Sequence, residues 1–234
     1  MSRELQVLCA GAARGLVEAV TPRFLAQTGV RIAGRFGAVG AIKEALMSGV
    51  PCDVLIVTDA MLRALRDNGA IEAGPLASIG KVRTGVASRA SEPLPGIGSA
   101  DALKTALLAA PEIYLPDLEK STAGAHVASV LERLHVREAI APKLAIFANG
   151  ATAMAALAER GAVGSLGCTQ VTEILCTPGL ALAGALPEPF DLATVYGAGV
   201  SETSCDPALA ASFIAMLCGA GTASLRRDGG FDSP

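Results

Sequence analysis

The chain has 234 residues, of which 51% are hydrophobic and 18% are charged, so it is long enough to bury the core of one large domain or two small ones. Its formal net charge is −3 and its Lys and Arg residues form no cluster, which argues against nucleic acid or an anionic membrane surface as a partner. Aromatic residues make up only 3% of the chain and Trp is absent, which argues against a ligand site built on aromatic stacking.

The start of the chain passes from a charged tetrapeptide directly into a strand-like run, without the pattern of a secretory signal. No apolar run approaches the ~18 residues of a membrane span, so no membrane insertion is expected. The cysteines lack close paired spacing, and most lie in apolar surroundings, as is typical of buried free thiols in a reducing compartment. The sequence as written therefore predicts a cytoplasmic protein, or a periplasmic one from which a leader has been removed. The cysteines are Cys9, Cys52, Cys168, Cys176, Cys205 and Cys218.

The first third of the chain repeats a pattern of strand, turn and helix. Such alternation predicts a parallel sheet covered by helices on both faces, with ligands bound outside the carboxyl ends of the strands. The predicted strands are Leu5–Cys9, Arg31–Phe36 and Asp53–Val57, and the predicted helices lie near Leu16–Thr28, Ala41–Met47 and Ala60–Asn68.

A second set of such units follows an extended crossing segment, Lys81–Ala87. A return crossing is predicted at Leu192–Val200, and one or two helices close the chain. We therefore expect two α/β lobes joined by two crossover strands, with a ligand cleft between them: lobe I from residues 1–81 and 193–234, and lobe II from residues 82–192. The strands predicted in the second lobe are Glu112–Leu115, Leu144–Phe147 and Ala162–Leu166.

Several catalytic and cofactor motifs are missing from the sequence. No G-x-G-x-x-G follows the first strand, and no Walker-type phosphate loop, H-E-x-x-H or C-x-x-C occurs. The stretch Val163–Gly167 nearly matches the nucleophile motif G-x-S-x-G, but Val163 replaces its first glycine. The only histidines are His126 and His135, which makes a serine-hydrolase triad improbable. No metal or cofactor is therefore expected.

Small residues precede five predicted helices, where a turn can point unpaired backbone N–H groups at an anion. Each helix start is worth about 0.3–1 kcal/mol to a nearby negative charge. A single turn of this kind is more often only a tight loop, but five of them in two lobes favour an anion site. These junctions are Gly11–Arg14, Gly37–Gly40, Ser121–Gly124, Asn149–Thr152 and Cys168–Thr172.

Nearly the whole chain resembles the molybdate-binding proteins of ABC importers. The resemblance is carried by LQVLCAGAARGLVEAVTPRFLAQTGVRI, FGAVGAIKEALMSGVPCDVLI, STAGAHVASVLERL, ATAMAALAERGAVGSLGCTQVTEI and LPEPFDLATVYGAGV. It implies a type II periplasmic-binding-protein fold that closes by a hinge on a small anion. It also implies an ABC permease as a partner if the protein is exported.

The ligand groups of that family match poorly. Where its loops usually offer a serine hydroxyl, this chain has Ala12 and Val39, and Gly167 replaces a usual tyrosine, whereas the turn around Ala123 matches. Each missing hydrogen bond costs about 1–3 kcal/mol, so a small organic carboxylate is expected rather than molybdate. Arg14 can pair with such a carboxylate, or it can be a solvated surface residue. The residues expected to contact the ligand are Ala12, Ala13, Arg14, Ala38, Val39, Thr122, Ala123, Asn149, Thr152, Cys168, Thr169, Gln170 and Tyr196.

Three functions remain open at this stage. The first is a solute-binding protein that closes on its ligand without chemistry. The second is a cofactor-independent isomerase of a small unsaturated carboxylic acid, since some relatives of the family are aconitate isomerases and proton transfer beside a carboxylate needs one positioned base. The third and least favoured is a ligand-sensing domain that docks a partner. The candidate bases are Glu173, Cys168, His126 and Asp59, although Glu173 can simply favour a helix dipole and His126 can be a packing residue.

Overall fold

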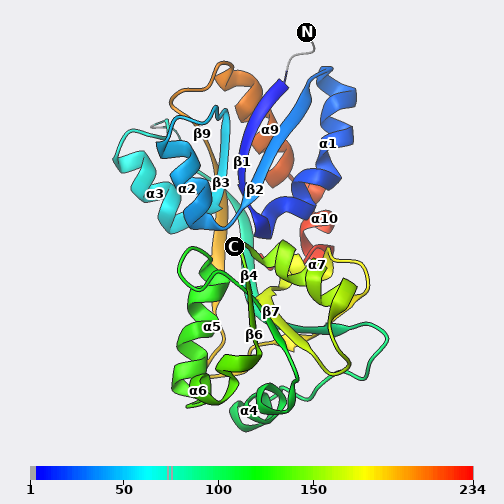
Figure 1. The fold of residues 1–234 in the computed structure, drawn as a ribbon. Helices are drawn as coiled ribbons and strands as arrows, with labels where there is room; N and C mark the ends of the chain where they lie inside the picture. Colours follow the sequence, from blue (N-terminus) through cyan, green and yellow to red (C-terminus); the bar gives the residue numbers. More distant parts are fainter. Residues whose placement is uncertain (1–3, 73, 75, 234) are drawn as a thin grey trace. The chain divides into compact units, whose positions relative to one another are not determined.

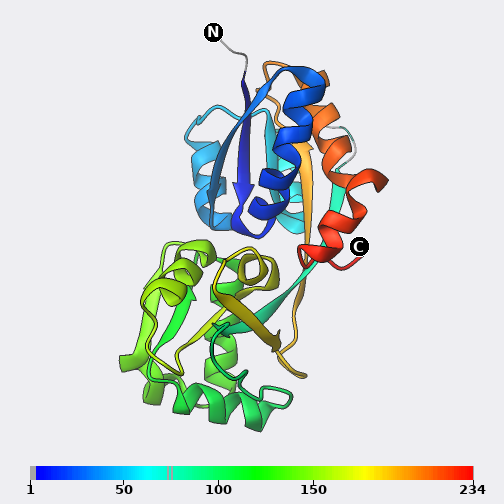
Figure 2. The same cartoon turned by 90° about the vertical axis from the view of Figure 1, so that its right-hand side faces the viewer.

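The computed structural model describes residues 4–72, 74 and 76–233, and the chain divides into two compact units. Unit 1 comprises residues 1–82 and 194–234, and unit 2 comprises residues 83–193. Each unit is an α/β body with its own sheet, as Figures 1 and 2 show. One strand, β4 (Ala77–Arg89), runs from unit 1 into unit 2.

In unit 1 the strands follow the order β2-β1-β3-β9, with β2, β1 and β3 parallel and β9 antiparallel to β3. Helices α1, α9 and α10 lie on one face of this sheet, and α2 and α3 lie on the other (Figure 1). The strands are β1 (Glu4–Ala10), β2 (Arg31–Gly37), β3 (Val54–Thr58) and β9 (Ala193–Val200). The helices are η1 (Gly11–Ala13), α1 (Arg14–Thr28), α2 (Val39–Met47), α3 (Asp59–Asp67), α9 (Pro207–Cys218), η3 (Ala220–Thr222) and α10 (Ala223–Asp228).

Local sequence explains where several helices of unit 1 begin and end. Gly29 ends α1 in the left-handed conformation, with φ of 71°, which glycine adopts without a steric penalty. The hydroxyl of Thr58 accepts the N–H of Met61 and caps α3. Asp206 caps α9, and Pro207 takes its first position, where a missing N–H does no harm.

In unit 2 the strands follow the order β4-β7-β5-β6, and β8 also pairs with β4. Strands β5, β6 and β7 are parallel, whereas β4 is antiparallel to both β7 and β8. The strands are β5 (Ile113–Pro116), β6 (Leu144–Phe147), β7 (Leu166–Gln170) and β8 (Leu180–Ala185). The helices are α4 (Ala100–Ala109), α5 (Thr122–Arg133), α6 (Arg137–Ile140), η2 (Ala141–Lys143), α7 (Gly150–Arg160) and α8 (Val171–Leu175).

The sheet of unit 2 separates two hydrophobic clusters. On one face Leu103 of α4 and Val127 of α5 pack with Cys168 of β7. On the other face Met154 of α7 and Ile174 of α8 pack with Tyr114, Leu157 and several alanines. Burial of these side chains, worth about 25 cal/mol for each Å² of apolar surface, is what holds the helices against the sheet.

The α/β class predicted from the sequence is confirmed, but some details were wrong. The sheets are mixed rather than parallel, because the crossing strands β4 and β9 run against their neighbours. The strand predicted at Ala162–Leu166 begins at Leu166 and continues through Gln170, so the stretch expected to be a turn is strand β7. Helix α4 and strand β8 were not predicted at all.

The cysteines are less uniformly buried than expected. Cys9, Cys52 and Cys168 are buried, Cys176 and Cys205 are exposed, and Cys218 is half-buried. All are free thiols.

Within the described residues, no single helix is long and apolar enough to cross a membrane. Only a sharply bent pair, Pro207–Cys218 with Ala220–Asp228, reaches that length and composition together.

Candidate functional site

Two helices of unit 1 begin at the carboxyl edge of its sheet without help from a side chain. No side chain caps η1, whose N-cap is Ala10, or α2, whose N-cap is Ala38. The predicted ligand residues Ala12, Ala13 and Val39 lie in these starts and are buried. A helix start that lacks a polar cap leaves its backbone N–H groups to water or to an anion. This edge can therefore bind negative charge, but it offers no hydroxyl group.

Arg14 is already paired in this structure. Its Nε donates to Glu18 Oε1 at 2.8 Å, and its guanidinium lies 5.5 Å from the centre of the Phe36 ring. Both partners of the ion pair are half exposed, and a pair of this type on a helix is worth only about 0.3–0.5 kcal/mol. The surface interpretation of Arg14 is thus favoured, although a ligand carboxylate could displace Glu18 at small energetic expense.

Two other residues proposed from the sequence lie in unit 1. Tyr196 is on β9 opposite Thr58 of β3, and its side chain is buried. Asp59, a candidate base, begins α3 and accepts two hydrogen bonds from Arg63, one of them at 2.6 Å. Both oxygens of the Asp59 carboxylate are thus engaged by Arg63, so Asp59 is a weak candidate.

In unit 2, the start of α5 is closed by its own chain. Ser121 Oγ accepts the N–H of Gly124, and Ala123 is buried, while Thr122 is half-buried. A Cβ on Gly124 would collide with the carbonyl oxygen of Asp117, so the turn before α5 packs tightly on the helix. Thr122 and Ala123 are therefore the first two residues of α5, directly after the tightly packed turn that follows β5.

His126 serves packing in this structure. Its Nε2 lies 2.7 Å from the carbonyl oxygen of Phe190. A carbonyl can only accept, so Nε2 carries the proton and cannot act as a base. This contact ties α5 to the loop after β8.

The start of α7 is capped by two of the residues predicted to contact a ligand, Asn149 and Thr152. Asn149 Oδ1 accepts the N–H of Thr152, and Thr152 Oγ1 accepts the N–H of Asn149 in return, which forms a capping box. We expected these side chains to hydrogen-bond a ligand, but helix α7 itself uses these groups.

The junction predicted at Cys168–Thr172 differs in its first half. Cys168 and Thr169 lie in strand β7 and pair with Val86 and Gly85 of β4, so their backbone is not an open turn. The Cys168 thiol is in the apolar core, where burial raises its pKa to about 12. It is therefore a poor nucleophile or base. Thr169 Oγ1 donates to the Glu173 carboxylate at 2.5 Å and is used internally.

Glu173 is a buried carboxylate in the first turn of α8, with 4% of its surface exposed. Burial raises the pKa of Glu173 above its ordinary value, and hydrogen bonds from the Thr169 hydroxyl and from the backbone of Gln170 and Ala151 offset only part of this rise. These hydrogen bonds support the interpretation that Glu173 stabilises a helix start. A role for Glu173 as a base is less favoured, because its carboxylate oxygens already accept protein hydrogen bonds.

Gln170 is the predicted ligand residue whose side chain lacks protein partners. It is 3% exposed, and neither its Nε2 nor its Oε1 has a hydrogen-bond partner. Thr84 lies directly opposite Gln170 in the β4–β7 ladder, and its buried hydroxyl also lacks one. The buried hydroxyl of Thr172, two residues after Gln170, also lacks a hydrogen-bond partner. Side chains opposite each other on antiparallel strands lie about 4.5–5.5 Å apart at Cβ, so Thr84 and Gln170 are neighbours.

The sequence did not single out the side chains of Thr84 and Thr172, although Thr172 ends the predicted junction Cys168–Thr172. A lone threonine inside an otherwise apolar strand is a faint signal, because a core can bury its hydroxyl against the backbone. Only the register of β4 against β7 places Thr84 beside Gln170.

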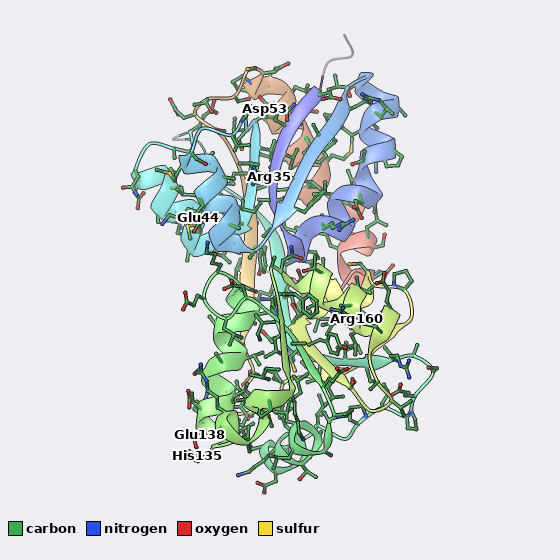
Figure 3. All side chains as sticks on the ribbon, viewed as in Figure 1. Arg35, Glu44, Asp53, His135, Glu138 and Arg160 are labelled. Carbon is green, nitrogen blue, oxygen red and sulfur yellow. The ribbon has the colours of Figure 1, made fainter. Side chains whose placement is uncertain are left out.

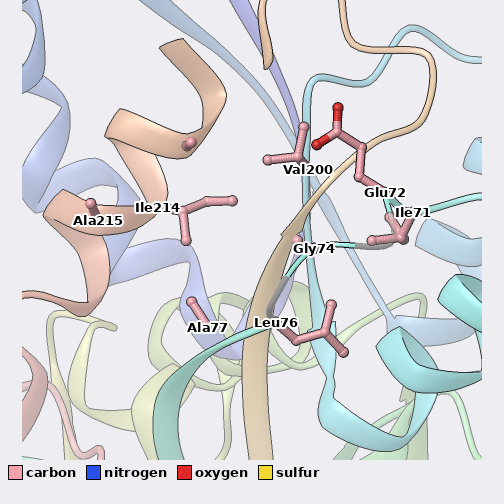
Figure 4. Close-up of a pocket in the computed structure, with 10 residues that line it drawn as sticks. Ile71, Glu72, Gly74, Leu76, Ala77, Val200, Ile214 and Ala215 are labelled. Atoms are coloured by element: carbon pink, nitrogen blue, oxygen red, sulfur yellow. The ribbon is translucent and has the colours of Figure 1, made fainter. Parts of the chain in front are cut away.

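A separate cavity of about 320 Å³ lies in unit 1 (Figure 4). It is lined largely by apolar side chains such as Leu76, Val200 and Ile214. Val200 pairs with Val54, the first residue of β3, so the cavity lies near the amino end of that strand, away from the helix starts described above. None of the residues predicted to contact a ligand lines it.

Metal ligands are not gathered anywhere in the described part of the chain. Among those residues no group of three or more His, Cys, Asp or Glu could hold an ion.

Comparison with known proteins identifies the family. The family described as bacterial extracellular solute-binding protein matches residues 5–232. An aconitate isomerase from a Pseudomonas species is 25% identical over 232 residues, which cover 97% of this chain and 86% of that protein. Among solved structures, the Azotobacter vinelandii periplasmic molybdate-binding protein matches with a TM-score of 0.81 at 17% identity, covering 98% of this chain and 99% of the other.

A further solved structure agrees with this assignment. The substrate-binding domain of a putative molybdenum ABC transporter from Clostridium difficile matches with a TM-score of 0.68 at 16% identity, with both chains covered in full. The predicted α/β fold of periplasmic binding proteins is therefore confirmed. The chain belongs to the bacterial extracellular solute-binding protein family.

Proposed function

We propose that this protein binds a small organic carboxylate, and that Gln170, Thr84 and Thr172 contact it in unit 2. The observation that carries this proposal is the buried amide of Gln170, which has no protein partner at either polar atom. A buried polar atom without a partner costs about 1–3 kcal/mol, so such groups call for an explanation. Hydrogen bonds from the Gln170 amide to a bound ligand would explain why the protein leaves these atoms without partners.

The chemistry of these groups favours a carboxylic acid over a metal oxyanion. Fully ionised molybdate and sulfate have only acceptor oxygens, so a protein site for them needs only hydrogen-bond donors. A glutamine amide offers two donor hydrogens and an acceptor oxygen, and threonine offers both roles as well. An organic acid with a hydroxyl or a second, protonated carboxyl group can hydrogen-bond to both the donors and the acceptors of these side chains.

The helix starts of unit 1 support the same ligand class. η1 and α2 offer backbone N–H groups that no side chain caps, but Ala12 and Val39 provide no hydroxyl beside them. Backbone donors suffice for the two oxygens of a carboxylate, whereas a tetrahedral oxyanion has four oxygens to satisfy.

A thermal-shift panel tests the proposal. It contains molybdate, tungstate, sulfate, phosphate, succinate, malate, citrate and both isomers of aconitate. A ligand present at 100 times its dissociation constant adds about 2.7 kcal/mol to the free energy of unfolding, which raises the melting temperature by several degrees. We expect di- or tricarboxylates to do this. Stabilisation by molybdate or tungstate alone would overturn the carboxylate proposal.

A second candidate function is a cofactor-independent isomerase of an unsaturated carboxylic acid. The observation in its favour is the aconitate isomerase that resembles this chain over 97% of its length. Proton NMR of trans-aconitate with the protein in deuterated buffer tests it. Appearance of the cis isomer, with deuterium beside a carboxylate, supports catalysis by proton transfer, and an unchanged spectrum after many hours contradicts it.

A periplasmic location and an ABC permease as a partner belong to the same proposal. They are supported by the extracellular family and by the ABC-transporter domain of similar fold. Fractionation of the native host with an antibody against this protein tests the location, and co-purification with a permease tests the partner.

A further inference from the structure

The carboxylate of Glu173 lies where a bound anion would be expected. α7 is a helix of 11 residues, and its first turn contains Ala151. The backbone N–H of Ala151 donates a hydrogen bond to the Glu173 carboxylate, which lowers the pKa of that group. The Thr169 hydroxyl donates to the same carboxylate at 2.5 Å. Helix starts bind anions because their first N–H groups have no partner inside the helix.

Glu173 also fixes the junction between β7 and α8. Gln170 is the N-cap of α8 and Glu173 is its third residue, and the Glu173 carboxylate accepts the backbone N–H of Gln170. This is one half of a capping box, in which the side chain at N3 reaches back to the N-cap. Gln170 makes no side-chain cap of its own, so its amide is not needed by the helix.

Gly150 shows that the space around this carboxylate is shaped for it. A Cβ at Gly150, the first residue of α7, would collide with Glu173 Oε2 and with Thr169 Oγ1. The φ angle of Gly150 is not in the left-handed region, so the backbone alone does not require glycine there. The absent side chain leaves room for the carboxylate against the helix start.

We propose that Glu173 is a positioning residue that fills the anion site at the start of α7 and holds the Gln170 backbone, which leaves the Gln170 amide for the ligand. The second part rests on the proposed function. In consequence the α7 start is not available to an external anion, and the ligand has to be recognised by the neighbouring polar side chains.

Two substitutions at Glu173 test this inference. Glu173→Ala removes the carboxylate and leaves a space lined by the same donors, which formate can enter. We expect the melting temperature of Glu173→Ala to fall by several degrees, and formate to restore part of the loss in a saturable manner. Glu173→Gln keeps the space filled and should not respond to formate. Asp101→Ala, at an exposed acidic residue in the first turn of α4, is the matched control and should neither lose stability to this extent nor respond to formate.

Amide NMR supplies a readout that a general loss of stability would not give. In Glu173→Ala, formate should shift the amide signals of Gln170 and Ala151 and leave those of the distant helix α4 unchanged. A Glu173→Ala protein that shows neither thermal recovery nor these shifts would overturn the proposal.

Gly150→Ala provides a second route to the same site. The added methyl group should displace the carboxylate and lower the melting temperature, although alanine is the better helix former by about 1 kcal/mol. Gly98→Ala is the control, since no atom lies within 4 Å of a Cβ there. An unchanged or raised melting temperature for Gly150→Ala would contradict the packing described here.

Ligand titration separates this inference from the proposed function. If trans-aconitate and the other carboxylates fail to bind the wild-type protein while formate restores Glu173→Ala, the proposed function is wrong and the anion site stands. If trans-aconitate binds the wild type and Glu173→Ala equally well, the positioning of Gln170 by Glu173 is wrong.

Discussion

Asp53 and Gln170 are both buried polar residues, but only one of them is partnered. The Asp53 carboxylate, labelled in Figure 3, accepts the N–H of Gln6 at 2.8 Å, the hydroxyl of Ser204 at 2.8 Å and the N–H of Cys205 at 2.9 Å. It holds the loop after β9 to the start of β3, and its role is structural. The amide of Gln170 makes no such contacts, and the proposed ligand contact at Gln170 rests on this difference.

This contrast gives a prediction for Gln170→Leu. Leucine has a similar volume and no polar atoms, so the variant should be as stable as the wild type or more stable in urea unfolding. Its affinity for the carboxylate identified in the thermal-shift panel should fall at least tenfold, or about 1.4 kcal/mol, because the ligand loses its hydrogen bonds. Isothermal titration calorimetry measures this loss.

Gln27→Leu is the control, since Gln27 lies on the exposed side of α1 in unit 1. It should leave affinity unchanged. Wild-type affinity in Gln170→Leu would exclude Gln170 from the ligand site.

At the scale of elements, some helices of each unit begin with a side-chain cap and others do not. Side chains of Thr58, Ser99, Ser121, Asn149 and Asp206 cap α3, α4, α5, α7 and α9, while η1 and α2 of unit 1 and α6 and α8 of unit 2 have no such cap. A helix that begins without a cap is less stable by about 0.5–2 kcal/mol than a capped one. The missing caps therefore leave backbone donors for another group.

Ala38→Ser tests this interpretation of α2. The new hydroxyl should accept an N–H of the first turn, raise the free energy of unfolding by about 1 kcal/mol, and weaken binding of an anion at the same N–H groups. Urea unfolding and calorimetry measure the two effects. Ser99→Ala, which removes the cap of α4, should lower stability without changing affinity. Increased stability together with unchanged affinity in Ala38→Ser would show that α2 does not contact the ligand.

Acid should loosen the turn before β7. Glu92 accepts the N–H of Gly164 and Glu112 accepts the Tyr114 hydroxyl, and these hydrogen bonds lower the pKa of both carboxyls below the ordinary value. A group with a lowered pKa in the folded state stabilises that state fully above its unfolded pKa, and this contribution is lost as the pH falls through the folded value. We therefore expect exchange of the Gly164 amide hydrogen, corrected for the intrinsic pH dependence, to become faster below about pH 4.

Glu112→Gln is the test of this mechanism. Its urea midpoint should depend less on pH between pH 6 and pH 3 than that of the wild type. An equal pH dependence in both proteins would show that other carboxyl groups dominate.

At the scale of the whole molecule, the net charge of −3 and the scattered basic residues set the salt dependence of binding. If the amide and hydroxyl groups around Gln170 bind the anion, no formal positive charge on the protein is screened by salt. The dissociation constant should then change less than about threefold between 50 and 500 mM NaCl. A tenfold weakening would instead indicate an ion pair, for which Arg14 is the candidate, and Arg14→Gln would then abolish the salt effect.

The sequence predicted most of the fold because hydrophobic runs and turn residues alternate clearly. Strand β6 was predicted with its observed bounds, and β1, β2 and β9 within one residue at each end. β7 was misplaced since its residues Gly167, Cys168 and Thr169 are small and resemble a turn, and only pairing with β4 makes them a strand. α4 was missed because it follows a segment rich in Pro and Gly.

The candidate site was harder to predict, and the reason is physical. The sequence by itself determined the α/β architecture, the resemblance to solute-binding proteins and the absence of hydroxyls at Ala12 and Val39, since these follow from local pattern and residue type. Only the tertiary structure decided which polar side chains have partners. Asn149, Thr152 and Thr169 are used by the protein, while Gln170 and Thr84 are not, because hydrogen bonding depends on register and packing between segments far apart in the chain.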